Sequence, residues 1–262
     1  TDGLIAWYPF NGNANDESGN GNHGTVYGAV LTPDRLGNPN SAYEFNGISD
    51  FIDLPSDFDF YERTISVWLN AYVFSTTGFP TNGTLVFDSD HPGMLNGLSI
   101  VGGDTVGGIN RINLTIGGNQ YHYINAMPNI WYHAAIVVNA LDIKFYINGN
   151  VMDSVPRGNM ISSQDGHYTA LIGTSRKFDR YFTGIIDDLR IYNRALTSGE
   201  VLSLFNVVPW SCGDTLIDSR DGQEYPTVKI GTQCWMAKNL NIGTKINSTS
   251  EGYQQLNNGI IE

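Results

Sequence analysis

The sequence Asp142-Ile-Lys-Phe-Tyr-Ile-Asn-Gly149 predicts a strand that ends in a hairpin turn. The pair Asn-Gly suits a type I′ turn, whose two central residues both take positive φ. Outward from this hairpin, further strand candidates recur at short intervals, over residues 3–10, 64–69, 109–116, 131–138, 170–173 and 182–192. This spacing predicts an all-β fold, an antiparallel two-sheet β-sandwich.

The composition is that of a turn-rich, acidic protein with enough apolar residues for a core. The 262 residues include 30 Gly and, by count, 27 Asn, and both residue types suit turns. Hydrophobic residues make up 41% of the chain and charged residues only 15%. A net charge of −12 at pH 7 argues against a nucleic-acid partner, which needs a basic face, and the apolar runs are too short for membrane insertion.

One helix signal follows the last strand candidate. Thr197-Ser-Gly-Glu200 matches a capping box, in which the Thr and Glu side chains each satisfy a backbone N–H, and predicts one short helix. We expect the sandwich domain to cover residues 1–206, followed by a linker at 207–211 and a small C-terminal extension at 212–262. Because the chain begins with Thr1 rather than Met, we expect a mature fragment whose signal peptide has been removed.

Eight separated motifs carry a family resemblance. They are Trp7-Tyr-Pro-Phe10, Asn13-Ala-Asn-Asp-Glu-Ser-Gly-Asn-Gly-Asn-His-Gly24, Ala42-Tyr-Glu-Phe-Asn-Gly47, Phe51-Ile-Asp-Leu-Pro55, Ile65-Ser-Val-Trp68, Trp131-Tyr-His-Ala134, Phe145-Tyr-Ile-Asn-Gly149 and Phe182-Thr-Gly-Ile-Ile-Asp-Asp-Leu-Arg-Ile-Tyr-Asn-Arg-Ala-Leu196. Through them, about residues 3–206 resemble the laminin-G-like jelly-roll family of the concanavalin A-like lectin/glucanase superfamily. The resemblance implies a jelly-roll sandwich, of a kind that occurs in adhesins, in carbohydrate-binding modules and in non-catalytic parts of enzymes.

The C-terminal extension resembles a second family. Cys212-Gly-Asp-Thr215, Asp218-Ser-Arg-Asp-Gly-Gln-Glu-Tyr225 and Gln233-Cys-Trp-Met-Ala-Lys-Asn-Leu-Asn241 are similar to the start of the Fibrobacter-type major paralogous domain of secreted bacterial proteins. Residues 212–262 would be a truncated copy of it. Both cysteines of the chain, Cys212 and Cys234, lie in this segment, and we expect them to form a disulfide. The alternative is two buried thiols.

The jelly-roll resemblance also implies a structural calcium site where the N-terminal loop meets the last strand. Asp16 and Asn22 lie in an oxygen-rich, Gly-rich loop, and such oxygens are the ligands that calcium prefers. Strict alternation would place Asp187 on one face with Leu189 and Ile191, where a buried carboxylate needs a cation or several N–H donors. We expect calcium to be bound by Asp16, Asn22 and Asp187. The alternative is that Asp16 caps a turn and Asp187 accepts backbone N–H groups.

Two loops could contact a ligand. One contains Asp90 and His91, and the other contains Arg176 and Arg180 and is followed by Tyr181. A basic, aromatic loop on an acidic protein could hold an acidic sugar or a carboxylate of a partner, because Arg binds carboxylates bidentately. The alternatives are a plain solvated turn for the first loop and compensation of neighbouring acidic residues for the second.

Signals for catalysis are weak. The sequence has no paired-carboxylate run of the glucanase kind, no His-Glu-x-x-His and no Gly-x-Ser-x-Gly. His133 is expected to make a structural hydrogen bond, and Trp7, Trp68 and Trp131 are expected in the core rather than as sugar platforms.

These observations predict a non-catalytic, secreted or cell-surface bacterial module that binds a polysaccharide or glycan or acts in adhesion, with a structural calcium. The alternative is a structural spacer or protein–protein interaction module of a larger surface protein.

Overall fold

The computed structural model describes residues 2–56, 58, 60–74, 84–89, 98–106, 109–116, 119–157, 169–175, 178–206, 215–217, 224–230 and 233–237. The chain forms two compact units, Thr1–Val207 and Val208–Glu262, and each is described by itself.

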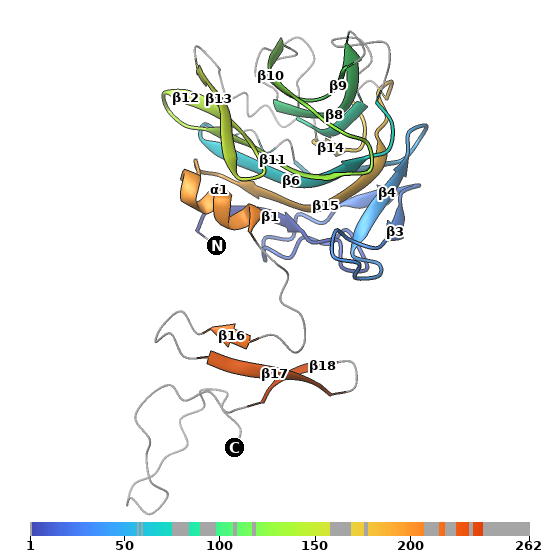
Figure 1. Cartoon of the computed structure of the whole chain (residues 1–262), viewed down its shortest axis with the longest axis vertical. Coiled ribbons are helices and arrows are strands. Elements are labelled where there is room, and N and C mark those ends of the chain that lie inside the picture. Colours follow the sequence, from blue (N-terminus) through green and yellow to red (C-terminus); the bar gives the residue numbers. More distant parts are fainter. Residues whose placement is uncertain are drawn as a thin grey trace, which may run out of the picture. The chain divides into compact units, whose positions relative to one another are not determined.

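Two antiparallel sheets face each other in the first unit (Figure 1). The eight-stranded sheet has the order β13-β12-β11-β6-β15-β4-β3, with β1 also paired to β15, and the seven-stranded sheet has the order β10-β9-β8-β7-β14-β5-β2. The strands are β1 (Leu4–Tyr8), β2 (Thr25–Tyr27), β3 (Val30–Thr32), β4 (Ala42–Asn46), β5 (Phe51–Asp53), β6 (Arg63–Ala71), β7 (Thr84–Asp88), β8 (Leu98–Val106), β9 (Ile109–Ile116), β10 (Asn119–Asn125), β11 (Trp131–Val138), β12 (Asp142–Ile147), β13 (Asn150–Pro156), β14 (Leu171–Ile172) and β15 (Thr183–Tyr192). The predicted β-sandwich is confirmed.

The hairpin predicted around Asn148-Gly149 joins β12 to β13. Asn148 and Gly149 have φ of 49° and 76°, which is the left-handed region that a type I′ turn requires at both central positions. A β-branched residue would be strained there, so this pair of residues fixes the turn. The register set by the turn, Ile147 with Asn150 and Tyr146 with Val151, shifts at a bulge before Phe145 pairs with Asp153.

One hydrophobic core fills the space between the two sheets. Along β6, Ile65, Val67 and Leu69 belong to this core, whereas Ser66 and Trp68 lie on the opposite face of the strand. Period-two alternation therefore gives the eight-stranded sheet an inner face toward the core and an outer face away from it.

Strand β15 interrupts this alternation with a β-bulge. Asp187 pairs with Trp68 and Arg190 pairs with Ser66, so three steps along β15 match two steps along β6. The extra residue is Asp188, whose φ of 47° is unusual for a residue other than glycine. The bulge turns Asp187, Asp188 and Arg190 to the outer face, while Leu189 and Ile191 remain in the core.

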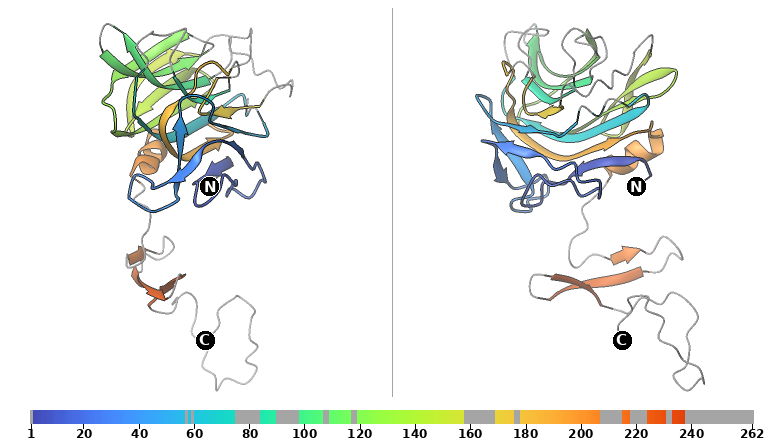
Figure 2. Two further views of the ribbon diagram at one scale, coloured as in Figure 1. Left: turned by 90° about the vertical axis from the view of Figure 1, so that its right-hand side faces the viewer. Right: turned by 180° about the vertical axis from the view of Figure 1, so that it is seen from behind.

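The helix α1 (Ser198–Phe205) lies on the outer face of the eight-stranded sheet, as Figures 1 and 2 show. Thr197 is its N-cap, and the predicted capping box with Glu200 is confirmed. Val201 is buried in a second apolar cluster, which α1 forms with Ala135, Val137, Tyr146 and Tyr192 of the sheet.

Among the described residues, no helix is long and apolar enough to cross a membrane.

The second unit has a three-stranded antiparallel sheet in its described part. Its order is β16 (Thr215–Ile217), β17 (Glu224–Ile230) and β18 (Gln233–Met236). Tyr225 is buried there.

Candidate functional site

Three aromatic side chains form a cluster at the β2 edge of the seven-stranded sheet. Tyr27 of β2 is the direct cross-strand partner of Phe51 of β5, and their rings stack with centroids 4.5 Å apart and an interplanar angle of 13°. Phe178 packs edge-on against Phe51, with centroids 5.1 Å apart and an angle of 65°. Tyr27, Phe51 and Phe178 are called the aromatic cluster below.

The aromatic cluster faces outward. Ile52 of β5 is in the core and Val26 of β2 packs against it, so the neighbouring Tyr27 and Phe51 point to the outer face of the sheet. Tyr27 is 47% exposed and Phe178 is 48% exposed. Large aromatic side chains gathered on a surface mark a place where a ligand or partner removes them from water.

The backbone holds this cluster in a costly conformation. Phe178 has a φ of 54°, a left-handed value that is rare and unfavourable for a bulky side chain. Gly28, which follows Tyr27, has a φ of 79°, and a Cβ at this position would come within 2.2 Å of Asp50 Oδ1. Asp50 in turn accepts a hydrogen bond from the Asn46 backbone N–H at 3.0 Å. The close fit of Gly28 on Asp50 fixes the direction in which Tyr27 projects.

A polar cross-strand pair lies directly beside the aromatic pair of Tyr27 and Phe51. Thr25 is the cross-strand partner of Asp53, and these positions are two residues from Tyr27 and Phe51 along the same strands, so the four residues share one face. Thr169 Oγ1 donates to Asp53 Oδ1 at 2.7 Å. Within the described part of the chain, Asp53 Oδ2 has no hydrogen-bond partner. This half-buried carboxylate can therefore still accept hydrogen bonds from a ligand.

The loop that carries Phe178 is the basic, aromatic loop singled out in the sequence. Arg180 Nε lies 3.7 Å from Asp179 Oδ1, and Asp179 also accepts from Ser175 Oγ at 2.6 Å. Tyr181 is half-buried. The other predicted ligand contacts, Arg176, Asp90 and His91, lie outside the described residues, as does the predicted pairing of Cys212 with Cys234.

Asp16 is saturated by hydrogen bonds from its own loop and from β1. Its Oδ1 accepts from the backbone N–H of Trp7 at 2.9 Å and of Ser18 at 2.8 Å, and its Oδ2 accepts from the Asn22 N–H at 2.9 Å. Burial alone would raise the pKa of Asp16, but hydrogen bonds from Ser18, Trp7 and Asn22 outweigh it and lower the pKa below its usual value. The bond from Ser18 makes an Asx turn, and the bond from the Asn22 N–H brings Asn22 to Asp16 across the loop.

Asp187 does not lie on the face with Leu189 and Ile191, and that expectation was wrong. Strict alternation fails because of the bulge at Asp188, so Asp187 faces outward opposite Trp68. There it forms an ion pair with Arg35. Burial raises the pKa of Asp187 to about 7, Arg35 opposes this rise, and Asp188 adds to it.

These contacts do not fit the calcium site expected from Asp16, Asn22 and Asp187. The Asp16 oxygens already accept N–H groups, and a guanidinium stands against Asp187, where a second cation would be repelled. Among the described residues, no group of three His, Cys, Asp or Glu side chains is arranged to hold a metal. The calcium site therefore stays a prediction without support from this geometry.

The expected roles of His133 and the tryptophans are met only in part. His133 is buried, and its Nε2 lies 2.8 Å from Ser66 Oγ, so its structural hydrogen bond is confirmed. Trp7 and Trp68 are not in the core between the sheets. Trp68 lies on the outer face beneath Phe205 of α1 and the Arg35 guanidinium, and Trp7 is covered by Arg190.

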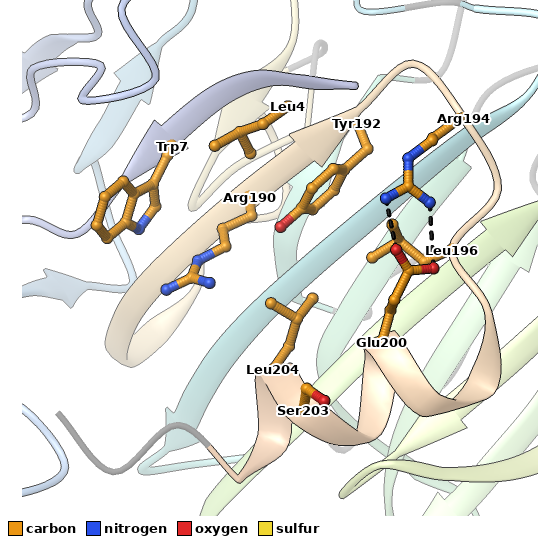
Figure 3. A pocket seen from close by; sticks show the side chains of 9 residues that line it. All are labelled: Leu4, Trp7, Arg190, Tyr192, Arg194, Leu196, Glu200, Ser203 and Leu204. Atoms are coloured by element: carbon orange, nitrogen blue, oxygen red, sulfur yellow. Dashed lines mark hydrogen bonds and ion pairs between the residues drawn. The ribbon is translucent and has the colours of Figure 1, made fainter. Parts of the chain in front are cut away.

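A pocket of about 360 Å³ lies between α1 and the outer face of β1 and β15 (Figure 3). Each of its arginines is held by a carboxylate, Arg190 by Asp188 at 2.9 Å and Arg194 by Glu200 at 2.5 Å. The pocket is lined by Leu4, Trp7, Arg190, Tyr192, Arg194, Leu196, Glu200, Ser203 and Leu204. Because these charges are paired within the protein, the pocket presents no uncompensated cation to a ligand.

Residues 45–202, more than half of the chain, match the family model Laminin_G_3, which describes the concanavalin A-like lectin/glucanases superfamily. The chain belongs to this superfamily. The predicted resemblance of the first domain is therefore confirmed, and this jelly-roll family accounts for the two large sheets. The family match ends at residue 202, before the second unit.

Solved structures share the fold. Domain 4 of AbnA, a GH43 extracellular arabinanase from Geobacillus stearothermophilus in complex with arabinotriose, is 24% identical, with a TM-score of 0.62 over 78% of this chain and 98% of that one. The binding domain of Botulinum neurotoxin DC in complex with SialylT is 16% identical, with a TM-score of 0.57 over 80% of this chain and 52% of that one.

A curated relative is the adhesion G-protein coupled receptor V1 of Danio rerio, which is 28% identical over 159 residues. The match covers 55% of this chain but only 2% of the receptor, so the chain corresponds to a small part of that relative's length.

Proposed function

We propose that the first unit is a non-catalytic glycan-binding module of a secreted or cell-surface protein and that the aromatic cluster is its binding platform. The observation that carries the proposal is the exposed cluster of Tyr27, Phe51 and Phe178, held by a left-handed backbone at Phe178. The C–H face of a sugar ring is apolar and packs well on an aromatic ring, while its hydroxyl groups need polar partners at the rim.

The relatives support this proposal. The arabinanase domain was solved with arabinotriose and the neurotoxin domain with SialylT, and both share this fold. The adhesion receptor supports an extracellular setting for the module. A bacterial surface location and the Fibrobacter-type nature of residues 212–262 remain proposals from the sequence.

Binding should be measured by isothermal titration with arabinotriose and with a panel of neutral and acidic oligosaccharides. We expect Tyr27→Ala and Phe178→Ala each to weaken binding by roughly tenfold or more, as for a central aromatic contact in an interface. Tyr61→Ala is the matched control, because Tyr61 is 59% exposed and lies outside the aromatic cluster, where it packs on Arg157. Unchanged affinity in both cluster variants would defeat the assignment of the platform.

A second candidate function is adhesion through a protein partner, as in a spacer or protein-interaction module. The match to the adhesion receptor favours it. If no glycan of the panel binds while the aromatic cluster is required for attachment to a purified surface protein, this second function replaces the first.

A further inference from the structure

We infer that the aromatic cluster selects neutral sugars, with Asp53 accepting hydrogen bonds from their hydroxyl groups, and that it disfavours sugars carrying a carboxylate. This inference rests on the proposed glycan-binding function and names its ligand class. It favours a different ligand from the acidic sugar that the basic loop over residues 176–180 could hold.

The first step of the argument is the position of Asp53. It lies on the same strand and the same face as Phe51, two residues further on, which is about 7 Å along the strand. A sugar ring that packs on the aromatic cluster therefore places part of its rim beside this carboxylate. Thr169 holds one carboxylate oxygen at 2.7 Å, and Oδ2, which has no hydrogen-bond partner among the described residues, can accept from a ligand.

The second step is the chemistry of an ionised carboxylate. It accepts hydrogen bonds and donates none, so it is complementary to hydroxyl groups. A carboxylate on the sugar would bring two like charges together without a hydrogen atom between them. At a partly exposed position this repulsion reduces affinity by roughly tenfold, and added salt relieves it.

The third step is the charge of the surrounding groups. Among the described residues next to the cluster, Asp50 and Asp53 are acidic, and Arg180 of the Phe178 loop is paired with Asp179. The whole chain carries a net charge of −12 at pH 7, which adds a weak repulsion for any anion. The described surroundings thus favour a neutral ligand.

The test compares galactotriose with trigalacturonic acid, in which each CH₂OH group is replaced by a carboxylate. Isothermal titration of the full chain in low salt should give at least about tenfold tighter binding of galactotriose, and the difference should shrink in 0.5 M salt. Arabinotriose serves as a second neutral probe.

Asp53→Asn tests the residue itself. We expect neutral trisaccharides to bind about tenfold more weakly, because a charged acceptor becomes a neutral one, and the preference for neutral over acidic sugar should largely disappear. Asp153→Asn on β13 removes the same charge from the other sheet and should leave the preference unchanged.

Equal or tighter binding of the acidic trisaccharide would overturn the inference, most directly if Arg176→Ala abolished that binding. An unaltered preference in Asp53→Asn would also overturn it. In both cases sensitivity to Phe178→Ala would leave the proposed function standing. Failure of the wild-type chain to bind any of the three sugars would instead count against the proposed function.

Discussion

Arg35 and Asp187, which are 152 residues apart in the chain, form an ion pair on the outer face of the eight-stranded sheet. Both side chains are almost fully buried, because Arg35 also lies over the ring of Trp68, 4.6 Å from its centroid, and Phe205 of α1 stacks on the same indole. This pair therefore ties the loop after β3 to the bulge of β15 beneath the helix.

Loss of one partner should cost more than loss of both. Above about pH 8, where Asp187 is ionised in the folded state, Arg35→Met leaves its carboxylate buried without a cation and should lower the free energy of unfolding by about 3–5 kcal/mol. The double variant Arg35→Met/Asp187→Asn removes the unpaired charge and should recover much of this loss. Chemical denaturation of the single and double variants measures both values.

Arg194→Met provides the control, since the Arg194–Glu200 pair is partly exposed and should contribute within about 1 kcal/mol. An equal loss in the Arg35 and Arg194 variants would contradict this account.

The contribution of Asp187 to the stability of the first unit should decrease as pH rises from about 4 to about 7. Burial raises the pKa of Asp187 to about 7, with Arg35 opposing and Asp188 adding to the shift, so the folded state holds a proton that the unfolded state loses near its ordinary pKa. Stability that this proton provides is complete below the unfolded pKa and is lost as pH passes the folded pKa. Asp187→Asn should flatten this part of the pH profile of unfolding.

His133 should make the stability of the first unit depend on pH in the opposite direction to Asp187. Burial lowers its pKa to about 4, Asp188 opposes this change, and Arg35 and Arg190 add to it. The unfolded state therefore takes up a proton below about pH 6.5 that the folded state does not bind, so the His133 contribution to stability falls as pH decreases from about 6.5 to about 4. Comparing His133→Gln with the wild type over this range isolates the effect. A wild-type profile that the variant leaves unaltered would argue against a neutral buried histidine.

The capping box should stabilise α1 measurably. Thr197→Ala removes the hydroxyl that accepts from the Glu200 N–H at 3.3 Å and should cost about 1 kcal/mol, which is a decrease of about 2–4 °C in Tm. Ser203→Ala, an exposed change within the same helix, should cost less. Calorimetry of both variants provides the comparison.

Calcium should leave the Tm unchanged. A ligand that bound only the folded state would add about 2.7 kcal/mol at 100 times its Kd, but Asp16 and Asp187 are already satisfied by N–H groups and by Arg35. Melting of chelator-treated protein with and without calcium checks this. An increase of several degrees that Asp187→Asn abolishes would restore the calcium hypothesis.

The local elements of the fold could be predicted because short sequences determine them. The Asn148-Gly149 turn and the Thr197–Glu200 box each depend on residues within a few positions of each other. The bulge at Asp188 could not be predicted in this way, because a strict period of two contains no place for an extra residue. One inserted residue was enough to move Asp187 from the expected core face to the outer face.

The candidate binding platform was missed for a different reason. Tyr27, Phe51 and Phe178 come from three distant segments, and only the sheet order β14-β5-β2 and the Phe178 loop bring them together. The sequence signal for this platform is Phe178 itself, an aromatic residue inside the basic loop over residues 176–180.

The pairing of β1 with β15 has a mechanical consequence. Leu4 lies opposite Tyr192, the Asn193 N–H donates to the Gly3 carbonyl at 2.9 Å, and Arg194 Nε donates to the Asp2 carbonyl at 2.9 Å. The chain thus enters and leaves the sandwich at neighbouring points of one antiparallel ladder. Tension applied through these two points separates β1 from β15 starting at the Leu4–Tyr192 end. The hydrogen bonds between the two strands then break one after another and do not share the force. Under a pulling force, α1 and β1 should therefore peel away first, while the sandwich behind them stays folded.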